Sequence, residues 1–168
     1  MFNRDVFGIL IKVQGAMMNV GAVNVTKADL EQLSEFRHQM RRFERFSEQA
    51  AQGEGITPLQ YLLLLHIKGH PGRDWAHVGE LAEYLQAKHH GVVALISRCE
   101  AVGLVRRRAS KADHRRVEVH LLKAGETILS RLVELHRAEL RSLEGTFRVP
   151  MIGLVPVRST IIGAGLQD

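Results

Sequence analysis

The spacing of apolar residues changes from the period of a helix to the period of a strand within one short stretch of this 168-residue chain. Two helical patterns come first. Residues 78–85 and 88–102 each keep one apolar face, made by Val78, Leu81, Ala82 and Leu85 and then by Val92, Leu95, Ile96, Cys99 and Val102. Only Gln86-Ala87 separates them, and Gly103 ends the second. Two short helices joined so tightly predict a helix-turn-helix.

Beyond Gly103 the apolar period is two. Residues 104–108, Leu-Val-Arg-Arg-Arg, predict a basic strand, and residues 116–121 alternate polar and apolar side chains. Residues 110–114 between them have the composition of a turn. The pair therefore predicts a β-hairpin with a charged tip.

Helical patterns also lie on both sides of this region. Residues 28–52 predict a long amphipathic helix, and Thr57-Pro58-Leu59-Gln60 has the sequence of a capping box. The helix that this box opens is apolar nearly all round from Leu59 to Ile67, which predicts a core helix, and 69–76 is expected to be a loop. Residues 124–143 predict a further helix whose broad apolar face is formed by Ile128, Leu129, Leu132, Leu135 and Leu140.

The positive charge is concentrated in the hairpin. Between Leu104 and Arg116 there are six basic residues and one acidic residue, Asp113. The local net charge is therefore +5, which equals the net charge of the whole chain. A basic strip of this kind binds phosphates by releasing counterions. A solvated edge strand protected by charge is the structural alternative, but the position directly after a helix-turn-helix favours double-stranded DNA as the partner.

Composition excludes several classes of protein. Apolar residues make up 45% and charged residues 24%, as in globular domains, and the single cysteine excludes a disulfide framework or a cysteine-rich zinc site. The low aromatic content argues against an RNA-stacking surface. We find no nucleotide-binding or catalytic motif, so neither enzyme activity nor a cofactor is expected. Lys12 and Gln14 interrupt the apolar stretch 6–25, so no membrane span or export signal is expected and the predicted location is cytoplasmic.

The order of these elements resembles the MarR family of bacterial transcription regulators. ITPLQYLLLLHI (56–67) is similar to the core helix of the family, and VGELAEYLQAKHHGVVALISRCEAVGLVRRR (78–108) is similar to its helix-turn-helix and first wing strand. KADHRRVEVHLLKAGE (111–126) resembles the wing, with the Asp-x-Arg pattern of the family at Asp113 and Arg115. The resemblance covers roughly residues 28–143.

This resemblance implies a mainly α (α+β) fold, a winged helix-turn-helix on a helical dimerisation platform. It divides the chain into an apolar N-terminal arm (1–27), a dimerisation helix (28–55), the DNA-binding domain (56–123), a return helix (124–144) and an apolar C-terminal arm (145–168). A homodimer would then bind a pseudo-palindromic operator, most simply as a repressor. The C-terminal arm carries two prolines and four glycines, so it departs from the closing helix usual in the family.

The expected DNA-binding residues lie on the second helix of the pair and on the wing. On the helix they are Lys88, His89, His90, Gly91 and Arg98; on the wing they are Arg107, Arg108, Lys111, Asp113, His114, Arg115 and Arg116. Arg115 is expected to enter the minor groove, while Arg98 either contacts a phosphate or pairs with an acidic neighbour. The adjacent histidines do not predict a metal site, because neighbours on a helix point about 100° apart.

Three further interpretations follow. By resemblance, a small aromatic or phenolic effector would release DNA from a pocket lined by Arg37, His38, Arg41, His66 and Trp75. Cys99 lies on an apolar helix face, which predicts a buried, unreactive thiol rather than a redox sensor. The alternative function is a winged-helix protein-interaction adaptor that does not read DNA.

Overall fold

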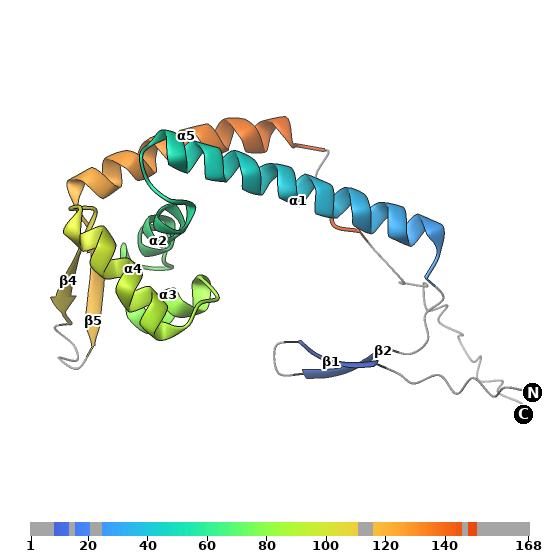
Figure 1. The fold of residues 1–168 in the computed structure, drawn as a ribbon, viewed down its shortest axis with the longest axis horizontal. Helices are drawn as coiled ribbons and strands as arrows, with labels where there is room; N and C mark the ends of the chain where they lie inside the picture. The colour runs from blue at the N-terminus through green and yellow to red at the C-terminus, as the bar shows by residue number, and fades with distance from the viewer. Residues whose placement is uncertain (1–8, 14–15, 21–24, 111–115, 146–147, 151–168) are drawn as a thin grey trace, which may run out of the picture. The chain divides into compact units, whose positions relative to one another are not determined.

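The computed structural model describes residues 9–13, 16–20, 25–110, 116–145 and 148–150, and Figure 1 shows its elements. The chain divides into two compact units, Met1–Gln39 with Phe147–Asp168 and Met40–Thr146, and the boundary falls within helix α1, Lys27–Gly53. In the first unit, strands β1 (Ile9–Val13) and β2 (Ala16–Val20) pair antiparallel. The predicted N-terminal arm therefore contains a pair of antiparallel strands.

The second unit holds the elements from residue 56 onward. In chain order they are α2 (Pro58–Lys68), β3 (Trp75–His77), α3 (Val78–Tyr84), α4 (His89–Ala101), β4 (Val105–Ala109), β5 (Val117–Leu121) and α5 (Lys123–Ser142). Figure 1 shows β4 and β5 as a hairpin beside α4. The predicted fold class, mainly helical with a small winged sheet, is confirmed.

Helix α2 begins as its capping box predicts. The Thr57 hydroxyl accepts the Gln60 N–H at 3.2 Å, and the Gln60 side chain accepts the Thr57 N–H at 2.8 Å. Three of its side chains are fully buried in the core with Leu81, Ile96 and Leu132 from the other helices, namely Leu63, Leu64 and Ile67. The prediction of a core helix is confirmed for this side, whereas Leu59 and Leu62 on the other side are exposed.

A third strand joins the wing. The sheet order is β3-β5-β4, with Trp75 opposite His120 and Val105 opposite Leu121. The prediction of a loop over 69–76 is therefore wrong for Trp75 and Ala76. Their extended conformation comes from pairing with β5, which lies more than forty positions later in the chain.

Helix α4, the wing and α5 meet at Leu104. Gly103 ends α4 with φ +73°, a conformation that side-chain-bearing residues rarely adopt, and the Leu104 N–H then donates to the Cys99 carbonyl at 2.9 Å. The Leu104 carbonyl accepts the Leu122 N–H at 2.9 Å and lies against Gly125, in the first turn of α5. Two helices and a strand are thus joined through one residue.

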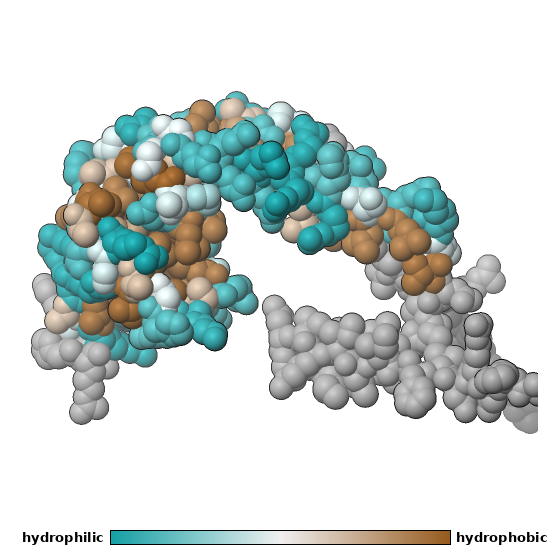
Figure 2. All heavy atoms as spheres, in the orientation of Figure 1, coloured by the Kyte–Doolittle hydropathy of each residue, from teal (hydrophilic) through white to brown (hydrophobic). Residues whose placement is uncertain are grey.

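The predicted apolar face of α5 is only partly buried. Leu129 and Leu132 lie in the core, whereas Leu135 and Leu140 are 46% and 56% exposed. The residue after Leu135, His136, is buried instead and stacks on Tyr61 with ring centroids 4.9 Å apart. On α4, Val102 is exposed because it lies beyond the last helical residue. Hydrophobic residues accordingly reach the surface among hydrophilic ones (Figure 2).

Candidate nucleic-acid interface

The start of α4 is held clear of the protein core. The turn from α3 passes through Gln86 at φ +49°, and the Ala87 N–H closes it by donating to the Ala82 carbonyl at 3.0 Å. Val92, Leu95 and Ile96 anchor α4 in the core. The residues that precede this anchor are exposed: Lys88, which caps the helix, and His89, His90 and Gly91. The chain therefore presents a basic helix start to solvent.

Arg98 lies near the end of α4 and is exposed. Of the two roles expected for it, pairing with an acidic neighbour finds no support among the described residues, because none of their carboxylates lies within ion-pair distance of it. Cys99, the next residue, is fully buried. Burial raises the pKa of the Cys99 thiol, outweighing a hydrogen bond from Gln60, as expected of an unreactive thiol.

The wing strands carry the basic residues on two faces, because side chains alternate along a strand. Arg106 and Arg108 are exposed, and Arg116 is exposed at the start of the return strand, whereas Arg107 is half-buried. Four of the expected wing contacts lie outside the described residues: Lys111, Asp113, His114 and Arg115. Their roles stay predictions.

Arg107 faces α4 and is hydrogen-bonded to it. Its guanidinium pairs with the Glu100 carboxylate at 2.6 Å, and its backbone N–H donates to the same carboxylate at 2.8 Å. These hydrogen bonds lower the pKa of Glu100, and the one from the backbone N–H of Arg107 has the largest effect. Sequence reasoning did not separate Arg107 from its neighbours, but the strand period could have done so, because it places Arg107 on the face of buried Val105.

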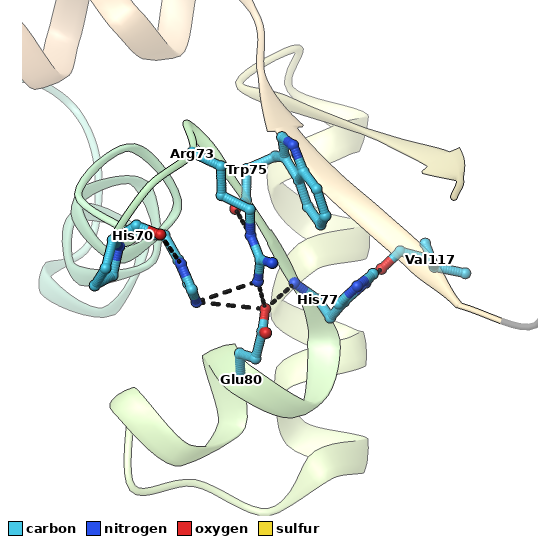
Figure 3. Close-up of polar contacts among 7 residues, drawn as sticks. His70, Arg73, Trp75, His77, Glu80 and Val117 are labelled. Atoms are coloured by element: carbon cyan, nitrogen blue, oxygen red, sulfur yellow. Dashed lines mark hydrogen bonds and ion pairs between the residues drawn. The ribbon is translucent and has the colours of Figure 1, made fainter. Parts of the chain in front are cut away.

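A second set of polar contacts holds the start of α3 (Figure 3). The Glu80 carboxylate accepts the His77 N–H at 2.8 Å and a hydrogen bond from Arg73, whose guanidinium carbon lies 4.0 Å from the centroid of the Trp75 ring. Burial alone would raise the pKa of Glu80, but these hydrogen bonds outweigh it and lower the pKa. Arg73 thus links the β3 strand to α3.

His77 connects the same region to the wing. Its Nδ1 donates to the Val117 carbonyl at 3.1 Å, so the first helix of the pair is tied to β5 (Figure 3). An open groove of ≈ 640 Å³ lies between these elements and is lined from α3, α4 and the wing by residues that include Gly79, His89, Val93, Arg107 and Arg116. Helix α4 and the wing therefore border one concave surface.

The five residues expected to line an effector pocket are distributed over both units. Arg37 and His38 lie on the part of α1 that belongs to the first unit, while Arg41, His66 and Trp75 belong to the second. His66 lies beside Tyr84 with ring centroids 5.2 Å apart, and burial lowers its pKa. None of the five lines the groove beside α4 or a cavity of ≈ 300 Å³ beside Lys123. The effector pocket stays a prediction.

Comparison with known proteins identifies the fold that carries these residues. Residues 54–116 match the MarR family. Over these residues the chain is similar to the MarR family.

Individual relatives agree with the family match. A Thauera aromatica protein, whose name assigns it to transcriptional regulation of the hcr operon, is 29% identical over 96 residues, 57% of this chain and 56% of the relative, so the chain spans little more than half of that protein. The MarR regulator AbsC of Streptomyces coelicolor superimposes with a TM-score of 0.63 at 21% identity, over 75% of this chain and 84% of AbsC. An S. aureus MepR variant bound to an oligodeoxyribonucleotide superimposes with a TM-score of 0.55 at 20% identity, over 69% of this chain and 82% of MepR.

Helices long and apolar enough to cross a membrane are absent from the part of the chain that the structure describes.

Proposed function

We propose that this chain is a transcription regulator that binds double-stranded DNA through α4 and the wing, with α4 in the major groove. The observation that carries the proposal is the exposed basic start of α4, Lys88 to His90, where His89 lines the same groove as Arg116, an exposed arginine of the wing. Lysine and imidazole N–H groups donate to base acceptors and phosphates. Arginines on the wing hold the phosphate backbone, which sets position and orientation.

We further propose that the regulator acts in the cytoplasm as a homodimeric repressor. Its platform would be built from 28–55 and 124–144. Apolar side chains exposed on α5, among them Leu135 and Leu140, support a protein partner for that helix. Two winged domains related by a two-fold axis would meet half-sites about one helical turn apart, roughly 10 bp.

Release by a small aromatic or phenolic effector belongs to the same proposal, with Arg37, His38, Arg41, His66 and Trp75 as the lining. The chain has one tryptophan, so binding near Trp75 is measurable directly by its fluorescence. A panel of aromatic acids and phenols that changes neither this fluorescence nor the DNA affinity would remove the effector from the proposal.

DNA selection followed by fluorescence anisotropy tests the central claim. Fragments of genomic DNA are selected with the purified chain, and the affinity of the selected sequence is measured over a range of salt concentrations. We expect a steep fall of log K with log salt, because phosphate contacts release counterions. Binding no tighter than that of a scrambled duplex would contradict the proposal and favour the adaptor function.

Two variants locate the contacts. Arg108→Gln, on the exposed face of β4, should weaken all duplexes alike and reduce the salt slope by about one unit, whereas Lys88→Ala should also relax sequence preference if it meets a base edge. Arg137→Gln is the matched control, because Arg137 is exposed on α5 and its ion-pair partner among the described residues is Glu134 on the same helix. A loss for Arg137→Gln equal to that for Arg108→Gln would show that net charge alone governs binding.

A further inference from the structure

Three consecutive arginines on β4 differ in what surrounds them. Arg106 and Arg108 are exposed on one face of the strand, and Arg107 shares the other face with buried Val105. That face is turned toward α4, the proposed recognition helix. Arg107 therefore contacts α4, whereas Arg106 and Arg108 lie on the opposite face of the strand. The three arginines carry the same charge, but their different surroundings argue against one role for all three.

Every interaction of Arg107 that ties it to α4 falls on one face of that helix. Its guanidinium pairs with Glu100 at 2.6 Å and donates to the Val93 carbonyl and the Ser97 hydroxyl, each at 2.9 Å. Val93, Ser97 and Glu100 are spaced by four and three residues, so they lie above one another over two turns. The fork of the guanidinium spans these turns as a single charged group.

The backbone completes the connection. Strand β4 is at the edge of the sheet, and the Arg107 N–H donates to Glu100 Oε1 at 2.8 Å instead of to another strand. Glu100 therefore accepts from both the backbone and the side chain of one residue. Hydrogen bonds to an ionised carboxylate are among the stronger ones in proteins, and the two together fix the strand as well as its side chain.

We propose that Arg107 is a positioning residue that, through Glu100, fixes the wing to the recognition helix and does not hold a phosphate. This inference rests on the proposed function, because it concerns how two elements reach one duplex. A wing held at a fixed angle loses less conformational freedom on binding than a mobile one, so the DNA affinity is higher.

The acidic partner provides the decisive test. Removing a negative charge from a DNA-binding domain ordinarily strengthens binding, because repulsion of phosphates is lost. Glu100→Gln should do the opposite and weaken operator binding by roughly three- to tenfold, since a charged hydrogen bond is lost, with an unchanged salt slope. Glu83→Gln, which removes an exposed carboxylate from α3 on the same groove, is the matched control and should bind as tightly as the unmodified chain or more tightly.

Variants of Arg107 separate positioning from phosphate binding. Arg107→Lys keeps the charge that a phosphate needs but loses the fork that spans Val93 to Glu100, so we expect it to bind as weakly as Glu100→Gln. The double variant should bind about as weakly as either single variant, because both remove the same connection. Wild-type affinity for Arg107→Lys, a salt slope reduced by about one unit for Arg107→Gln, or Glu100→Gln binding as tightly as Glu83→Gln would each overturn the proposal.

A measurement without DNA keeps this inference separate from the proposed function. Hydrogen exchange at the Arg107 amide should be faster in Glu100→Gln than in Glu83→Gln, because only the former replaces the charged acceptor at 2.8 Å by a neutral amide oxygen, which is a weaker acceptor. Equal exchange in the two folded variants would overturn the connection itself. If the unmodified chain selects no DNA while exchange is accelerated, the proposed function fails and the structural connection stands.

Discussion

Replacing Gly125 with alanine should destabilise the winged unit, although alanine is the better helix former. Gly125 is buried in the first turn of α5, and a Cβ atom placed on it would lie 2.3 Å from the carbonyl oxygen of Leu104 and 3.2 Å from the carbonyl carbon. These neighbours are backbone atoms at the junction of α4 and β4, which cannot rotate away as a side chain does. The methyl group therefore requires α5 and the wing to move apart.

The magnitude follows from two opposing effects. Glycine to alanine in a helix gains roughly 1 kcal/mol, whereas overpacking of a well-packed site costs about 1–3 kcal/mol. Because the contact is with backbone atoms, we expect an overpacking cost near the upper end of that range. The net loss in the free energy of unfolding is then about 1–2 kcal/mol. For a unit of this size that lowers Tm by roughly 4–10 °C.

Gly91→Ala is the matched control for this prediction. Gly91 also lies in the first turn of a helix, α4, but no other atom lies within 4 Å of a Cβ placed on it. The same substitution should therefore raise the free energy of unfolding by roughly 0.5–1 kcal/mol. Urea denaturation followed by circular dichroism and by Trp75 fluorescence measures both variants. If Gly125→Ala is stabilised, or if both variants shift in the same direction by similar amounts, the argument from close approach is refuted.

Three other predictions concern contacts described above. Thr57→Ala should lower the free energy of unfolding by about 1 kcal/mol, and Thr57→Ser should retain it; equal urea midpoints would contradict the capping role. Because the folded pKa of Glu80 lies below 4.5, its contribution is complete above that pH and is lost as the pH falls through the folded value. We expect Glu80→Gln to be less stable than the unmodified chain by about 1 kcal/mol at neutral pH, after solvent screening. This difference should vanish in acid, and a pH-independent difference would show that the ionised carboxylate is not its source. Native Cys99 should react with a thiol reagent far more slowly than in urea, and equal rates would contradict its burial.

Local sequence patterns predict most of the second unit, because its helices carry their own boundaries. The capping box at Thr57 and the apolar faces of α3 and α4 are each encoded within a few residues. Strand β3 is not encoded in this way. Its three residues, Trp75-Ala76-His77, are too few to show an alternation, and they become a strand only through the partner that β5 supplies. Such an element is visible only in the folded chain.

The buried position of His136 has the same cause. Its neighbours in sequence, Leu135 and Leu140, are the more apolar residues, yet they face solvent. His136 is surrounded by Phe43, Phe46 and Tyr61, and its Nδ1 donates to the Leu132 carbonyl at 2.7 Å. The aromatic rings pack on the imidazole, although its buried Nε2 has no hydrogen-bond partner among the described residues. The helical period predicts which faces exist but not which residue at a face boundary is buried.

The same reasoning applies to charge in the candidate interface. A count of basic residues treats the wing as uniform, whereas the strand period and the fold divide its arginines between solvent and α4. Glu100 distinguishes the two groups of arginines. A carboxylate among phosphate-binding residues opposes DNA binding, unless its ion pair with a neighbouring cation favours binding more than a contact of that cation with DNA would. In winged domains of this kind, an acidic residue on the recognition helix facing an arginine on the first wing strand should therefore mark that arginine as part of the scaffold, and the arginines on either side of it as the ones available to the duplex.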